Sequence, residues 1–183
     1  MTKEFSVDRL ETKAFAQQEG QLHGDQPLGQ FERLLAEDLR GDAAANQPVH
    51  WALEGEWLES TGGPGEAWLH LDADTVVQMQ CQRCLQPFDV EVLAKRSFRF
   101  VKDEATAEAL DDESEEDVLV LQPFLNAHAL IEDELLMALP MVPMHEACPV
   151  DVKLESATPD FDAAPAEKTN PFAALASLRI DKS

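Results

Sequence analysis

The spacing of apolar residues changes along this chain, and that change constrains the fold most. From residue 49 apolar and polar residues alternate, with Val49, Trp51 and Leu53 between His50 and Glu54. The alternation returns over 67–81 and 88–101, and a glycine- and proline-rich turn signal separates the first two segments at 61–65. This pattern predicts antiparallel strands with one face packed on a core.

Two segments outside these strands carry apolar residues at helical spacing, 28–40 and 126–139. Gly41 and Pro140 follow them as natural ends. The adjacent acids at 132–134 point about 100° apart on a helix, so we expect a solvated face there rather than a metal site. The chain is therefore predicted to be α+β, with an antiparallel sheet (a partly open barrel or a curled sheet) flanked by a few helices.

The three tryptophans, at positions 51, 57 and 68, all fall in the predicted strands. Exposed aromatic side chains on a sheet form stacking platforms for RNA bases. Because these residues alternate with charged ones, we expect them in the core instead.

Composition along the chain predicts one domain over residues 1–148 and a tail over 149–183. Nine acids and no base lie between 103 and 117, which is typical of a solvated, mobile loop. After Cys148, four prolines and scattered acids predict a flexible tail.

The tail ends in a small apolar cluster at 170–178. Asn170 is a candidate N-cap and Pro171 suits the first helical position, while Phe172, Leu175 and Leu178 recur at helical spacing. Two interpretations remain open: a short helix that docks on a partner, or a tail that packs on its own domain.

The cysteines form two short motifs, Cys81-x-x-Cys84 and His145-x-x-Cys148. Three sulfurs and one imidazole are a ligand set for one tetrahedral structural Zn²⁺. The long gap between the motifs does not exclude a site, because each doubling of a loop costs only about 0.6 kcal/mol. Ordinary reduced thiols, a packing corner that has lost its metal, and a redox pair remain alternatives.

Basic residues are concentrated next to this motif, although the chain as a whole is acidic. Four of them are candidate contacts for a phosphate backbone: Arg83, Lys95, Arg96 and Arg99. Internal ion pairs with the abundant carboxylates are the alternative.

Charge limits the class of partner. The chain has 14 Lys+Arg against 36 Asp+Glu, a formal net charge of −22. Nucleic-acid binders usually show a basic footprint, so RNA contact would have to be local or made through a partner. An acidic chain attracts basic proteins, although acidity also simply maintains solubility.

The sequence contains no recognised catalytic motif and no recognisable export signal. The chain has no G-x-S-x-G, P-loop or G-x-G-x-x-G motif, so we expect no enzyme. The first residues do not resemble a signal peptide, and no apolar run approaches the ~18–20 residues of a membrane span. We therefore expect a cytoplasmic protein.

Three segments in order resemble the YceD family, the large ribosomal RNA subunit accumulation proteins. They are CQRCLQPF at 81–88, EDELLMALPMVPMH at 132–145 and NPFAALASL at 170–178. The resemblance covers about residues 48–180 and is looser before them. The resemblance implies a role in accumulation of the large ribosomal RNA. It implies no catalytic residue in this chain.

Two functions from different classes follow. In the first, the chain is a non-enzymatic factor of large ribosomal subunit biogenesis that binds a basic large-subunit ribosomal protein or a ribosomal precursor particle. In the second, it is a zinc- or redox-responsive regulatory binding protein that acts through Cys81, Cys84 and Cys148.

Overall fold

The structure, a computed structural model, describes residues 5–59, 65–111, 114 and 116–153. The chain divides into two compact units, 1–148 and 149–183. Of the second unit, residues 149–153 are described and contain no helix or strand. The expected docking segment 170–178 lies outside the described residues.

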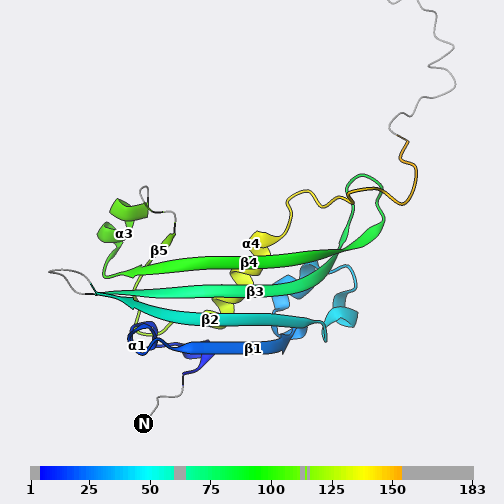
Figure 1. The fold of residues 1–183 in the computed structure, drawn as a ribbon. Helices are drawn as coiled ribbons and strands as arrows, with labels where there is room; N and C mark the ends of the chain where they lie inside the picture. The colour runs from blue at the N-terminus through cyan, green and yellow to red at the C-terminus, as the bar shows by residue number, and fades with distance from the viewer. Residues whose placement is uncertain (1–4, 60–64, 112–113, 115, 154–183) are drawn as a thin grey trace, which may run out of the picture. The chain divides into compact units, whose positions relative to one another are not determined.

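The first unit is built on a five-stranded sheet in the order β1-β2-β3-β4-β5. Its strands are β1 (Gln21–Pro27), β2 (Pro48–Leu58), β3 (Glu66–Gln80), β4 (Pro87–Val101) and β5 (Asp117–Val120) (Figure 1). The first four pair antiparallel, and β5 pairs parallel with β4. The predicted α+β fold with an open sheet is confirmed, and parallel β5 is a departure from purely antiparallel pairing.

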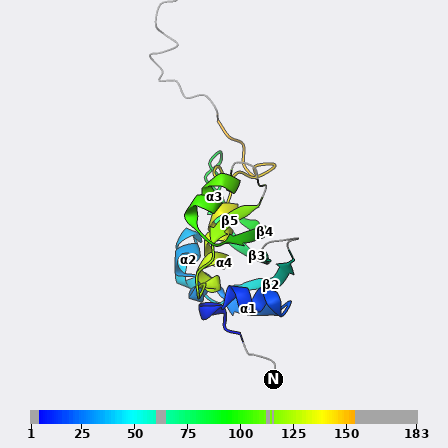
Figure 2. The ribbon, with the colours of Figure 1, turned by 90° about the vertical axis from the view of Figure 1, so that its left-hand side faces the viewer.

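The helices cover one face of this sheet. They are α1 (Thr12–Gln17), α2 (Glu32–Glu37), α3 (Glu104–Asp111) and α4 (Ala127–Ala138), with 3-10 turns η1 (Val7–Arg9), η2 (Leu28–Gln30) and η3 (Gly41–Ala44). Figure 2 shows α2 and α4 on the same side of the strands. Gly55 of β2 lets α1 approach closely, because a Cβ there would collide with Phe15. None of the described helices has the length and apolar character needed to cross a membrane.

The core lies between the sheet and these helices. Leu53, Leu69 and Phe98 of the sheet and Ile131 and Leu135 of α4 are all nearly or fully buried. The alternate side chains of β1 to β4 lie on the other face, which no described helix covers, and we call this the open face. Its charged and aromatic members are His23, Asp25, His50, Glu54, Glu56, Glu66, Trp68, His70, Asp72, Asp74, Asp89, Glu91, Lys95 and Arg99.

The helix predicted over 28–40 is wrong in extent. Phe31 has φ −109° and ψ 76°, which separates η2 from the six-residue α2. Asp38 is extended and ends α2, so Leu39 is 54% exposed rather than on a buried face. Strand β1 and helix α1 were not predicted.

The acidic segment 103–117 was predicted to be a mobile loop. It contains helix α3, and its last residue is the first residue of β5. Asp103 accepts hydrogen bonds from the backbone N–H of Thr106 at 2.9 Å and from its hydroxyl at 2.6 Å, which satisfies donors of the first turn. Three alanines, including the buried Ala107, supply helix propensity and a face that packs. The run of acids therefore belongs partly to regular structure.

Two further expectations are corrected by burial and register. Glu132 and Glu134 are buried, not solvated, because Arg33 and Arg96 pair with them. Trp51 and Trp57 pack in the core as expected, but Trp68 shares the register of His70 and lies half-buried on the open face.

Candidate metal centre

Two distant segments meet beyond the end of the β3–β4 hairpin. Cys81 directly follows β3 and Cys84 lies in the turn before β4, whereas His145 and Cys148 lie on the segment that follows α4. The prolines at 140 and 143 prevent the helix from continuing and keep this segment extended. The N–H of Gln82 donates to the carbonyl of Pro143 at 2.9 Å and joins the two segments.

The Cys81–Cys84 turn is tight and has an unusual backbone. The N–H of Leu85 donates to the carbonyl of Cys81 at 2.9 Å, and the N–H of Cys81 donates to the carbonyl of Gln86 at 3.0 Å. Leu85 has φ +60°, a left-handed conformation that costs a non-glycine residue about 1–2 kcal/mol. The turn thus directs both sulfurs of the motif toward the second segment.

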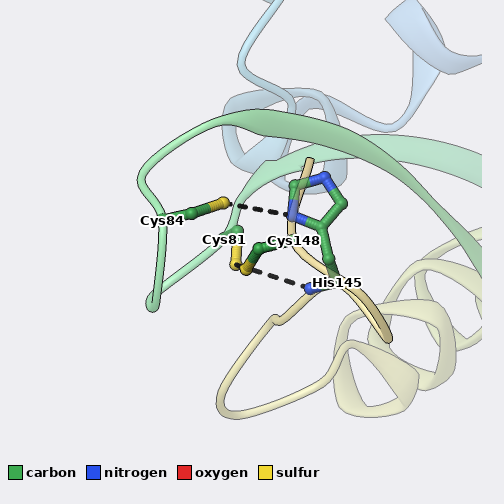
Figure 3. A group of neighbouring side chains, drawn as sticks. All are labelled: Cys81, Cys84, His145 and Cys148. Atoms are coloured by element: carbon green, nitrogen blue, oxygen red, sulfur yellow. Dashed lines mark hydrogen bonds between the residues drawn. The ribbon is translucent and has the colours of Figure 1, made fainter. Parts of the chain in front are cut away.

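The four predicted ligand residues converge, as Figure 3 shows. Cys84 Sγ lies 3.3 Å from His145 Nδ1, and Cys81 Sγ lies 3.9 Å from Cys148 Sγ. All four ligand atoms lie within 4.8 Å of one another. Zinc bonds of about 2.0–2.3 Å place tetrahedral ligands roughly 3.3–3.8 Å apart. The donor set and its spacing therefore fit a tetrahedral metal ion; we call this group the cysteine corner.

Neighbouring side chains hold the corner in place. Arg83 donates from Nε to Cys148 Sγ at 3.0 Å and from Nη2 to the carbonyl of His145 at 2.8 Å. The Phe88 ring packs on the His145 imidazole, with centroids 4.6 Å apart. Such outer contacts orient metal ligands. The sequence analysis missed both roles, although each residue lies within the motif 81–88.

The pKa values of the Cys81 and Cys84 thiols are shifted in opposite directions. Burial alone would raise the pKa of the Cys81 thiol, but backbone N–H groups of Cys84, His145 and Arg83 outweigh it and lower that pKa to about 5. Burial raises the pKa of Cys84. Cys81 is therefore a thiolate at neutral pH, the form in which cysteine ligates metals.

The basic residues predicted near this site do not form one patch. Arg83 belongs to the corner, and Arg96 faces the helices, where it pairs with Glu134 at 3.1 Å. On the open face Lys95 lies 3.6 Å from Asp72, and Arg99 lies 2.7 Å from Glu66. These ion pairs match the alternative that we left open, and RNA contact through the four residues stays a prediction.

Comparisons with known proteins agree with the resemblance. The family model described as "Large ribosomal RNA subunit accumulation protein YceD" matches residues 69–179, a range that contains the whole cysteine corner. A curated relative, "Large ribosomal RNA subunit accumulation protein YceD" of Haemophilus influenzae, is 31% identical over 106 residues. That alignment covers 56% of this chain and 60% of the relative, so it spans less than two thirds of the relative's length. No solved structure matches the chain.

Proposed function

Because the chain belongs to the YceD family of large ribosomal RNA subunit accumulation proteins, we propose that it supports accumulation of the large ribosomal RNA without catalysing a reaction. The family match over residues 69–179 is the observation that carries this proposal. The lack of a recognisable catalytic motif in the sequence supports a role in binding rather than in chemistry.

The proposed partner is a basic large-subunit ribosomal protein or a ribosomal precursor particle. Charge supports this choice, since a chain of net charge −22 attracts basic polypeptides over long range. Arg83, Lys95, Arg96 and Arg99 are proposed to make at most local contacts with RNA, in addition to the binding of the basic partner. Docking by Asn170, Pro171, Phe172, Leu175 and Leu178 is the proposed role of the tail segment.

The cysteine corner is proposed to hold one structural Zn²⁺. Three sulfurs and one imidazole suit zinc better than magnesium or calcium, which prefer oxygen ligands. A bound ion would supply a cross-link between the β3–β4 turn and the segment that follows α4. Arg83 and Phe88 would keep Cys148 and His145 in their ligating orientations.

A second function, that of a metal- or redox-responsive regulator, has one observation in its favour. Cys81 Sγ lies 3.9 Å from Cys148 Sγ, so loss of a metal would leave two sulfurs close together. Cys81 is buried and Cys148 is partly exposed. Reversible metal loss that changes partner binding would support this alternative over a constitutive structural site.

Affinity capture from a lysate of the native host tests the proposed function. The full chain serves as bait, and captured RNA and proteins are quantified with and without ribonuclease. The proposal expects enrichment of large-subunit over small-subunit components. Capture that resists ribonuclease would identify a ribosomal protein as the direct partner, and loss of capture would identify RNA or a precursor particle. Equal recovery of both subunits' components would contradict the proposal.

A further inference from the structure

The open face of the sheet is strongly one-sided in charge. Among the described residues of β1 to β4 it carries eight carboxylates, two lysine or arginine side chains and three histidines. The carboxylates are Asp25, Glu54, Glu56, Glu66, Asp72, Asp74, Asp89 and Glu91. The ratio of carboxylates to lysine and arginine is therefore higher on the open face than in the chain as a whole.

The lysine and arginine side chains on this face are already paired. Lys95 lies next to Asp72, and Arg99 lies next to Glu66. Asp74 and Glu91 form no ion pair with a lysine or arginine among the described residues; Asp74 lies opposite His50 in the β2–β3 register. Repulsion between unpaired carboxylates at fixed positions on a rigid sheet is relieved when a cationic ligand binds.

The face is also shaped to receive an extended ligand. Strands β3 and β4 each have 15 residues, which gives a surface roughly 50 Å long. At one end is a hollow of about 390 Å³. Its lining residues are Glu19, Gln21, Glu54, Gly55, Glu56 and His70. That volume accommodates the charged end of a lysine or arginine side chain among three carboxylates.

The charges on this face also exclude one class of ligand. A phosphate backbone would meet uncompensated carboxylates, and the two lysine or arginine side chains that could attract it each lie beside a carboxylate. A basic polypeptide meets complementary charge along the whole surface.

We propose that the open face is the docking surface for a lysine- and arginine-rich polypeptide segment. This inference rests on the proposed function, because it assigns a surface to the basic partner. The helices and the core hold the opposite side of the sheet, so the open face can be occupied without any change in the fold.

Binding of a labelled peptide that alternates lysine and arginine with alanine tests the proposal, with the full chain as receptor. The triple variant Glu54→Gln, Asp74→Asn, Glu91→Gln removes three open-face charges that form no ion pair with a described lysine or arginine. The control variant Glu37→Gln, Glu104→Gln, Glu108→Gln removes three exposed charges elsewhere. Both variants have the same net charge, and matching melting temperatures show that both are folded.

The open-face variant should weaken peptide binding about tenfold, and the control should change it less than about twofold. Equal weakening by both variants would overturn the surface assignment, since net charge alone would then explain binding. A labelled oligoadenylate that bound the wild type more tightly than the peptide would also overturn it. These outcomes concern only the surface; the ribosomal RNA function is tested separately in cells.

Discussion

The carboxylate of Glu132 accepts the backbone N–H of Arg33 at 2.8 Å, although the two residues are 99 positions apart. The same carboxylate accepts the N–H of Leu34 at 3.3 Å and pairs with the Arg33 guanidinium at 2.7 Å. A side chain of α4 thus satisfies free donors in the first turn of α2, which no residue of α2 itself caps. This contact fixes the two helices to each other on the sheet.

Glu132→Ala should reduce the free energy of unfolding by about 2–4 kcal/mol, because it leaves two backbone donors of α2 unsatisfied and the Arg33 guanidinium paired with Asp133 alone. Urea denaturation measures the loss. Asp133→Ala is the matched control, since Asp133 also pairs with Arg33 but is half-exposed, and it should cost less than about 1 kcal/mol. Equal losses in the two variants would contradict the capping role.

Protein purified without chelator should contain about one zinc per chain, with sulfur at about 2.3 Å by X-ray absorption. Cys84→Ser should lose the metal, because it removes one of four ligands. His23→Asn changes a histidine on β1, away from the corner, and should retain it. Full zinc retention by Cys84→Ser, or no zinc uptake by the wild type, would rule out the site.

Asp38 should make stability depend on acid pH. Burial would raise the pKa of its carboxyl, but hydrogen bonds from the Arg40 guanidinium and from the backbone N–H groups of Gln78 and Arg40 hold it below its ordinary value of 3.8. The ionised form of Asp38 therefore stabilises the fold. This contribution is complete above about pH 3.8 and is lost as the pH falls through the lower pKa that the carboxyl has in the folded state.

Asp38→Asn should thus cost about 2–4 kcal/mol at neutral pH and progressively less in acid. Denaturation of both proteins between about pH 7 and pH 2 measures the difference. The neighbouring exposed Asp42→Asn serves as control and should show little effect at any pH. A constant difference between Asp38→Asn and wild type down to the lowest pH would contradict the assignment.

Phe172→Ala should weaken association with ribosomal particles by about 10- to 100-fold, because burial of a phenylalanine contributes roughly 1.5–3 kcal/mol. It should barely change the melting temperature if the segment docks on a partner. Phe161→Ala, in the same tail but outside the cluster, should leave co-sedimentation unchanged. A lower melting temperature with normal co-sedimentation would favour a tail that packs on its own domain.

The sheet could be predicted because its signal is local. Each of the long strands carries its own alternation, and Leu53, Leu69 and Phe98 are buried as that alternation requires. Strand β1 gives little signal, since its inward positions include Gly24 and Gln26 as well as Leu22. Its pairing with β2 depends on partners 21 to 33 positions away.

The cysteine corner was predictable from ligand chemistry, but its supporting contacts were not. The spacing of Cys81 and Cys84 indicates a ligand pair without reference to the fold. The contact of Arg83 with Cys148 depends on how two segments 65 positions apart meet. The burial of Glu132 and Glu134 likewise depends on arginines from other elements, so sequence alone favoured a solvated face.

The most direct test of the proposed function is the ratio of large to small ribosomal RNA in cells depleted of this protein. Total RNA is quantified in depleted cells and in depleted cells that express the wild type or Cys84→Ser. Depletion should lower the ratio, and the wild type should restore it. An unchanged ratio in depleted cells would contradict the account, whatever the cysteine corner binds.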